Sequence, residues 1–525
     1  MPRPADFDLA RELAKPSFTP GRADAPGLAA LVAGGTEPAA TRATAALGGL
    51  GAPARAAIEV SVGAATDDGA KARLVAALGL VARAGDDAAQ RVLIDLVAAT
   101  SVRVRRAAIT ALGKLGTDDA RAAILARWDA GDAPPDERRA LTDALGKLGA
   151  GAALPRLQAL DAAADPELAR RRDRALLVAD REAKRGATSE VLGDVIAVPP
   201  SGATVRLGCR GGFAALLREE LGALGHAARD VTPSTVELPF AAIRGRLDTL
   251  FASRLWVTAA IRVPLPAGSL APSIVATLAS APVRALLAAW TRGPIRWRLT
   301  FAHGHQRGVV WAVARDVTAA APELLNDPTS TTWDVLVAND ARALDLVPRK
   351  LADPRFAYRV AEVPAASHPT VAAALAFVGA PRDGERVWDP FCGAGAELIE
   401  CARRARGSFV GTDIDPTALA AARANAASLE LHEADARTAR VPCDLIITNP
   451  PLGSRVQVDA AALLEAALPN LVRSLSPRGR LVWITPAPRR TGPVLAALGL
   501  TRTRVVAVDL GGVRGTLERW DMVRR

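Results

Sequence analysis

Apolar residues follow three different patterns along the chain, and each pattern predicts a different kind of domain. Between residues 26 and 185 they recur at helical spacing, as in Ala122–Trp128. Residues 187–345 mix strand-like and helical stretches, which predicts an α/β domain. Residues 350–525 contain short apolar runs that alternate with loops and helical stretches, as in a doubly wound parallel sheet. The sequence therefore predicts a multidomain chain, with residues 1–25 as an N-terminal extension.

A Leu-Gly pair repeats through the N-terminal region. It recurs at spacings of 31, 34 and 33 residues, at Leu47-Gly48, Leu78-Gly79, Leu112-Gly113 and Leu145-Gly146. A period of this length predicts paired helices, each of which buries its apolar face on its neighbours. The pattern resembles a HEAT-like solenoid of about four to five units. Its arginines line an RNA-binding face, surround a surface for a protein partner, or are ordinary solvated residues; the sequence leaves these alternatives open.

The middle region is predicted to carry several strands. We expect strands at Thr204–Cys209, Leu255–Val263, Ile295–Phe301 and Val309–Ala314 and a helix at Gly212–Leu224. The last two strands would form a hairpin across Gly304–Gly308. Residues 201–300 hold 12 arginines against five acidic residues, and such a basic excess fits a nucleic-acid partner.

A glycine-containing loop follows the first strand predicted in the C-terminal region. Asp389 ends that strand, and Gly393 and Gly395 let the backbone of the loop approach a ligand closely. Asp413 ends the second strand, 24 residues after Asp389. A carboxylate in this position can accept hydrogen bonds from both hydroxyls of a ribose. Asp415 is expected to cap the helix that follows.

Asn449-Pro450-Pro451 follows a further buried strand, Val441–Thr448. Ligands bind at this edge of an open parallel sheet, beside the switch in strand order. Because the two prolines lack backbone donors, the carbonyls of the Asn449 side chain and of Pro450 remain as acceptors for an amino group. The alternative is a plain proline-rich loop. In this order, the three segments predict a nucleotide-shaped cofactor pocket followed by a site for an exocyclic amino group.

These segments resemble the class I S-adenosylmethionine (SAM)-dependent methyltransferases of the THUMP-associated, UPF0020 type. That family carries a D-P-F-C-G-[ST]-G-T-x-L-I-E-A loop and an N-P-P-Y-G motif, and it methylates N2 of guanosine in tRNA or rRNA. The matching residues are Asp389, Pro390, Phe391, Cys392, Gly393, Gly395, Leu398, Ile399, Glu400, Asn449, Pro450, Pro451 and Gly453. The match extends over about residues 350–490. It implies a Rossmann-like catalytic domain, preceded by a THUMP-like RNA-binding domain at residues 187–345.

The resemblance also implies a role for individual residues. Cofactor-binding residues would be Asp389, Phe391, Gly393, Gly395, Asp413 and Asp435. Of these, Asp413 would bind the ribose and Asp435 the adenine amino group. The catalytic segment would be Asn449, Pro450, Pro451 and Leu452, in which Asn449 and Pro450 hold the target nitrogen. No metal ion is needed. Leu452 departs from the family, which has an aromatic residue there that stacks on the flipped base, and Ala396 replaces a Thr.

Composition narrows the setting in which this chemistry is expected. The chain has 525 residues and a formal net charge of +11, and by count only six of its 66 basic residues are Lys. Coding bias is one explanation for that preference, and recognition of phosphate by the planar guanidinium is the other. Cys209, Cys392, Cys401 and Cys443 form no C-x-x-C pair, which suits a reducing cytoplasm without zinc. The sequence contains no apolar run of membrane-spanning length, so we expect no membrane partner.

We therefore expect a cytoplasmic enzyme that transfers methyl from SAM to N2 of a guanine in structured tRNA or rRNA. One alternative within enzymes is methylation of adenine N6 or of a glutamine amide in a protein. The alternative from another class is a scaffold that binds RNA or protein and has weakened catalysis.

Overall fold

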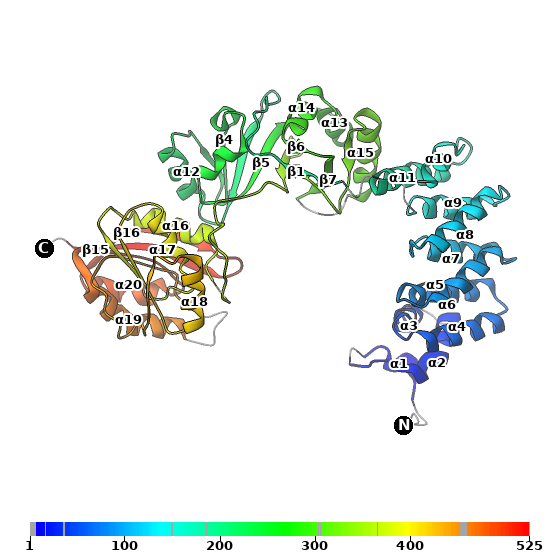
Figure 1. The fold of residues 1–525 in the computed structure, drawn as a ribbon, viewed down its shortest axis with the longest axis horizontal. Helices are drawn as coiled ribbons and strands as arrows, with labels where there is room; N and C mark the ends of the chain where they lie inside the picture. Colours follow the sequence, from blue (N-terminus) through cyan, green and yellow to red (C-terminus); the bar gives the residue numbers. More distant parts are fainter. Residues whose placement is uncertain are drawn as a thin grey trace. The chain divides into compact units, whose positions relative to one another are not determined.

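The chain forms two compact units in the computed structural model (Figure 1). The structure describes residues 7–15, 17–34, 37–148, 151–183, 187–302, 304, 306–364, 366–451 and 459–523. The first unit comprises Met1–Thr188 and Gln306–Ser330, and the second comprises Ser189–His305 and Thr331–Arg525.

The first unit consists of helices and the short strand β8 (Leu324–Asn326). Its α-helices are α1 (Leu9–Glu12), α2 (Ala25–Gly34), α3 (Ala39–Gly48), α4 (Ala52–Ala64), α5 (Asp68–Arg83), α6 (Asp87–Asp95), α7 (Val102–Leu112), α8 (Asp118–Asp129), α9 (Pro135–Leu145), α10 (Ala153–Gln158), α11 (Pro166–Ala183) and α15 (Arg307–Ala320). Helices α3, α5, α7, α9 and α11 pack against one another in succession, and α4, α6 and α8 lie beside them. A continuous core of Ala, Leu, Ile and Val side chains runs through these layers.

The repeated glycines mark the points where successive helices approach each other. A Cβ added to Gly79 on α5 would lie 2.7 Å from the Cβ of Ala111 on α7. A Cβ added to Gly113 would lie 2.9 Å from the Cβ of Ala144 on α9. Gly48 and Gly146 meet Leu80 and Ala175 in the same way. Glycine therefore recurs at this position because any side chain would push two neighbouring helices apart.

The predicted strand at 309–314 is wrong, because these residues lie within helix α15. Val313, Ala314 and Val317 are its buried residues, and their spacing is that of one helix face. The prediction relied on a short β-branched run, which does not distinguish a strand from a buried helix. Helix α15 packs against α11, so this segment, predicted as part of the middle domain, belongs with the N-terminal helices.

The second unit begins with a mixed sheet. Its strands follow the order β3 (Arg229–Thr232), β4 (Thr235–Pro239), β2 (Thr204–Cys209), β5 (Trp256–Pro264), β10 (Ala343–Pro348), β9 (Trp333–Val337) and β7 (Ile295–Phe301). Helices α12 (Ala214–Ala223), α13 (Leu270–Leu278) and α14 (Ala281–Ala289) accompany the sheet, and the pair β1 (Glu190–Val191) and β6 (Thr291–Arg292) lies apart from it. The strands predicted at 204–209, 255–263 and 295–301 are present.

A second sheet of seven strands forms the C-terminal part. Its order is β13 (Glu430–Glu433), β12 (Ser408–Asp413), β11 (Arg386–Asp389), β14 (Cys443–Thr448), β15 (Leu475–Thr485), β17 (Arg514–Met522) and β16 (Leu500–Asp509). Pairing is parallel from β13 to β15, and β17 is antiparallel to both of its neighbours. Numbered along the chain, the order is 3-2-1-4-5-7-6, so it reverses between β11 and β14. Ligands bind at the carboxyl ends of the strands at such a switch point.

Five helices complete this Rossmann-like domain. They are α16 (Pro369–Gly379), α17 (Ala396–Ala402), α18 (Pro416–Asn425), α19 (Ala460–Ser474) and α20 (Pro488–Ala497). Buried Trp388 and Trp483 lie in its core. Within the described residues, no single helix is long and apolar enough to cross a membrane; α13 and α14 pass that test only together, and they are bent by 54°.

Candidate active site

The loop between β11 and α17 closes around two glycines in left-handed conformations. Gly395 has φ +81°, and a Cβ there would lie 3.0 Å from the Leu429 side chain and 3.3 Å from Ala422. Gly393 has φ +49°, and a Cβ there would meet no atom within 4 Å. Gly395 is therefore required by packing, whereas Gly393 leaves open space beside the loop.

Asp413 ties the end of β12 to this loop. One of its carboxylate oxygens accepts a hydrogen bond from the Gly393 amide at 2.9 Å, and the other accepts from the Asp415 amide at 3.0 Å. Because each carboxylate oxygen can accept more than one bond, Asp413 retains capacity for ribose hydroxyls. Asp415 caps α18, as expected, by accepting from the Thr417 amide at 2.8 Å.

Two carboxyl groups lie buried beneath the loop. Asp389 accepts a hydrogen bond from the Phe391 amide at 3.0 Å, while its other oxygen has no partner among the described residues. Burial raises the pKa of Asp389 well above its usual range, and the neighbouring Glu397 carboxyl raises it further. Burial also raises the pKa of Glu397, against a hydrogen bond from Ser367. Two carboxyl groups buried this deeply take up a proton more readily than exposed ones.

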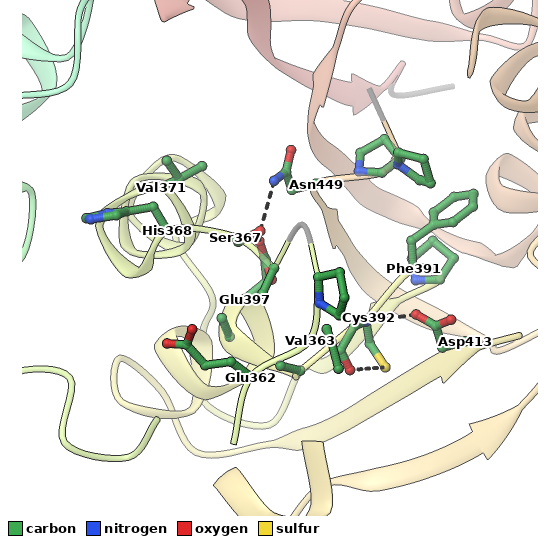
Figure 2. A pocket seen from close by; sticks show the side chains of 18 of the residues that line it. Glu362, Val363, Ser367, His368, Val371, Phe391, Cys392, Glu397, Asp413 and Asn449 are labelled. Carbon is green, nitrogen blue, oxygen red and sulfur yellow. Dashed lines mark hydrogen bonds between the residues drawn. The ribbon is translucent and has the colours of Figure 1, made fainter. Parts of the chain in front are cut away.

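A hydrogen-bonded chain leads from Glu397 to the Asn-Pro-Pro segment (Figure 2). The Ser367 hydroxyl donates to Glu397 Oε1, and the Asn449 Nδ2 donates to Ser367 Oγ at 2.8 Å. The other end of the amide, Asn449 Oδ1, is buried and has no partner within the described part of the chain. The amide is therefore fixed with its donor satisfied and its acceptor available.

These groups line one cavity of about 700 Å³. The predicted residues that line it are Phe391, Gly393, Asp413, Asp435, Asn449, Pro450 and Pro451. Asp389 and Gly395 support the loop from beneath. The Asp435 carboxylate is engaged by the Arg437 side chain, with Oδ1 and Oδ2 accepting from Nε at 3.0 and 2.9 Å. Leu452 lies outside the described residues, so its role stays a prediction.

Three further residues of the site were not predicted from the sequence. Ser367 and Glu397 orient Asn449, although they lie 82 and 52 positions before it. Arg210, which follows strand β2 of the mixed sheet, also lines the cavity, and its Nε is buried without a partner in the described chain. Glu397 lies in the first turn of α17, where an acidic residue is ordinarily favoured by the helix dipole, so no local pattern marked it either.

The cavity suits an adenosine-containing cofactor on its own chemistry. It combines an open glycine loop and a ribose-competent carboxylate with buried polar atoms that have no hydrogen-bond partner among the residues that the structure describes, namely Asp389 Oδ2, Thr448 Oγ1 and Asn449 Oδ1. Asp389 and Glu397 are acidic groups next to a pocket that would receive a sulfonium cation. A cation bound beside them would lower both pKa values and stabilise the ionised carboxylates, so these residues fit SAM.

The fold and this pocket define a SAM-dependent methyltransferase domain. Residues 357–516 match the family model UPF0020, RMKL-like, methyltransferase domain. A ribosomal protein L11 methyltransferase of Chromohalobacter salexigens is 34% identical over 122 residues, which are 22% of this chain and 38% of that protein. The chain thus spans about two fifths of this relative.

Two solved structures resemble a longer part of the chain. TrmN from Thermus thermophilus aligns with a TM-score of 0.52 and 22% identity, over 61% of this chain and all of that one. SMU.472, complexed with SAH, aligns with a TM-score of 0.47 and 14% identity, over 61% of this chain and 98% of that one. At this identity, the likeness to TrmN describes the fold.

Proposed function

We propose that this protein transfers a methyl group from SAM to an exocyclic amino group of RNA, with N2 of guanine in structured tRNA or rRNA as the target. When bound, SAM supplies an activated methyl: attack by an amine nitrogen breaks the methyl–sulfur bond, leaves the electron pair on sulfur and releases a proton from nitrogen. What remains for the chain is to hold the amine in the correct orientation, and orientation of this kind contributes a large part of the rate.

The free Asn449 Oδ1 carries this proposal. A fixed acceptor at the end of β14 binds an N–H of the target amine, and the Pro450 carbonyl lies next to it in the chain. The chain of Ser367 and Glu397 prevents the amide from turning its Nδ2 toward the amine. An amide donor in that place would repel the N–H groups of the substrate. The relay of hydrogen bonds from Glu397 through Ser367 to Asn449 therefore favours a substrate amino group over a substrate group that only accepts hydrogen bonds.

The wider architecture supports RNA as the substrate. Residues 357–516 match the RMKL-like methyltransferase domain, and TrmN aligns over 61% of this chain, a longer stretch than the matched catalytic domain. We therefore propose a THUMP-like role in RNA binding for the mixed sheet. The glycine contacts repeated between α3, α5, α7, α9 and α11 support HEAT-like repeats in the first unit.

A protein amine is the second candidate, because the curated relative is named as a methyltransferase of ribosomal protein L11. Both candidates would use Asn449 Oδ1 as the acceptor, and they differ in whether the amine belongs to RNA or to a protein. Adenine N6 stays open for the same reason. The identity of the labelled product separates these three substrates.

The test is transfer of tritium-labelled methyl from SAM to RNA and to protein from cells that lack this gene. Label in N2-methylguanosine, lost in Asn449→Ala while SAM binding by equilibrium dialysis is retained, is the expected result. Label in protein or in N6-methyladenosine would replace guanine by the corresponding alternative. No label in any fraction, despite SAM binding, would contradict catalysis and favour the scaffold.

A further inference from the structure

A second cavity of about 700 Å³ lies in the first unit, far along the sequence from the catalytic residues. It is a groove across helices α5, α7, α9 and α11. Two acidic side chains line it, Asp136 and Asp143. The basic side chains that line it number six and are Arg83, Arg103, Arg106, Lys114, Arg139 and Arg171. Its floor consists largely of small residues, among them Gly79, Ala107 and Ala111. The glycine contacts that bring the helices together thus also leave the groove open between long basic side chains.

Part of this charge is neutralised within the protein. Arg106 pairs with Asp136 at 3.0 Å, Arg171 pairs with Asp143 at 2.6 Å, and Arg139 pairs with Asp165. The other three cations, Arg83, Arg103 and Lys114, are exposed and have no ion pair or side-chain hydrogen bond within the described residues, and of these Arg103 attracts the Asp67 carboxylate. They are the groups available to a ligand.

Helix stability does not account for this arrangement. Arg83 and Lys114 lie at the C-terminal ends of α5 and α7, where a cation is favoured by the helix dipole. Arg103, however, lies in the first turn of α7, where the dipole disfavours a positive charge. Lys147 reports the positive field of this region. Burial lowers the pKa of Lys147, and the like charges of Lys114, Arg174 and Arg83 lower it further, whereas the attraction of Asp143 raises it.

We propose that this groove binds the phosphate backbone of the RNA substrate, away from the nucleotide that is methylated; this inference rests on the proposed function. Unpaired Arg and Lys side chains bind phosphate and release its counterions. A folded protein partner would need buried aromatic or large apolar anchors. Among the described lining residues, none is aromatic and Leu80 is the one large apolar side chain. An acidic protein segment is the competing occupant, and the test below includes it.

The test compares two triple variants of the full-length chain that lose the same charge. The groove variant is Arg83→Gln, Arg103→Gln, Lys114→Gln. The control is Arg11→Gln, Arg42→Gln, Arg91→Gln, three exposed residues of the same unit that do not line the groove. Binding of a fluorescein-labelled 30-nucleotide RNA of mixed sequence is measured by anisotropy at several salt concentrations. Circular dichroism melting establishes that both variants are folded.

The groove variant is expected to bind RNA up to about 50-fold more weakly at 0.15 M salt, since each lost contact to single-stranded phosphate lowers the salt slope by about 0.7. The control should change by less than about threefold, and SAM binding should be unchanged in both. Equal RNA binding by the two variants overturns the proposal. So does a groove variant that keeps RNA binding and loses binding of polyglutamate, which would assign the groove to an acidic protein segment.

A measurement on the unaltered protein covers the case in which the groove variant does not fold. RNA should protect Lys114 from an amine-reactive reagent, whereas Lys71, which does not line the groove, should remain reactive. Equal reactivity of Lys114 with and without RNA overturns the proposal. The two hypotheses fail separately: a wild-type protein that methylates no RNA removes the proposed function, and one that methylates RNA without protecting Lys114 removes only the groove.

Discussion

The two ends of the Asn449 amide have different surroundings, and this difference determines what the residue can bind. Nδ2 donates to Ser367 Oγ, which itself donates to Glu397 Oε1, so the serine hydroxyl must accept from the amide. Oδ1 has no partner in the described part of the chain. The orientation of the amide is thus set by a residue 82 positions earlier in the chain.

Removal of the serine hydroxyl should therefore impair catalysis more than cofactor binding. In Ser367→Ala the amide can rotate, and we expect kcat to fall about 10- to 100-fold because a misplaced group costs that much. The Kd for SAM should stay within about twofold, since no atom of the glycine loop changes. Steady-state kinetics and equilibrium dialysis measure the two quantities.

The control for this experiment is Ser408→Ala, which removes an exposed hydroxyl from β12 of the same domain. If Ser367→Ala and Ser408→Ala have the same kcat, the relay does not orient Asn449. A loss confined to SAM binding would also contradict it.

His368 gives the domain a measurable response to acid. Burial, together with the positive charges of Arg210, Arg359 and Arg355, lowers the pKa of His368 to about 4. An unfolded histidine titrates near about 6.5, so between these two values the unfolded chain binds the proton and the native chain does not. The free energy of unfolding contributed by His368 is therefore present above about pH 6.5 and is lost as the pH falls toward 4.

The variant His368→Asn isolates this contribution. Asparagine preserves the cap of α16, where the His368 side chain accepts from the Thr370 amide at 3.3 Å. Urea unfolding should show that the free energy of unfolding of the wild type falls more steeply between pH 7 and 5 than that of the variant. Parallel curves would mean that His368 titrates alike in the folded and unfolded chains.

At the scale of elements, the two glycines of the loop from β11 to α17 have different roles: Gly395 is needed for packing, and Gly393 leaves space for a ligand. In Gly395→Ala, a left-handed φ and contacts with Leu429 and Ala422 coincide, so we expect the free energy of unfolding to fall by about 1–3 kcal/mol. Gly393→Ala meets open space; it should cost less stability and act mainly on the Kd for SAM. Urea titration and dialysis on both variants separate the effects, and equal losses of stability would contradict the assignment.

Helix α17 also joins the catalytic sheet to the mixed sheet within the second unit. Its fully buried Glu400 pairs with Arg254 at 2.6 Å and accepts from the Tyr358 hydroxyl at 2.9 Å. Arg254→Ala leaves this carboxylate without its charge partner, and we expect the free energy of unfolding to fall by about 3–5 kcal/mol.

The exposed pair Arg292–Glu190 provides the comparison for Arg254. Its side chains are 73% and 51% exposed, against 11% and 0% for Arg254 and Glu400. Arg292→Ala should change the free energy of unfolding by less than about 1 kcal/mol. If the two variants unfold at the same urea concentration, the buried pair is not a main contact between the sheets.

Sequence patterns predicted these elements unevenly, for physical reasons. The strand ends at Asp389 and Asp413 were predictable because a parallel sheet has a local signature of apolar run, loop and helix. The segment 309–314 was not, since a short β-branched run suits a strand and a buried helix alike. Ser367 and Arg210 reach the pocket from distant parts of the chain, so no local pattern marks them. The Leu-Gly repeat predicted the repeat length, and the structure supplies its cause, the close approach at Gly79 and Gly113.

At the scale of the molecule, the first unit is assembled from two separate segments of the chain. Residues 306–330 return to the N-terminal helices, where α15 packs against α11 and the Arg174 guanidinium lies 4.7 Å from the centre of the Trp311 ring. A cut after residue 188 therefore does not separate the two units. It leaves α15 attached to the second unit without α11, one of the elements against which it packs.

A fragment of residues 189–525 should accordingly bind SAM and yet associate, because we expect the buried side chains Val313, Ala314 and Val317 to face α11 and to become exposed without it. Substitution of Val313 and Val317 by Ser should have opposite effects in the two chains. In the fragment it should reduce association, measured by light scattering. In the full-length protein it should lower the melting temperature, because the same side chains are buried there and each loss costs about 1–3 kcal/mol. A fragment that is monomeric without the substitutions would show that α15 does not depend on the N-terminal helices.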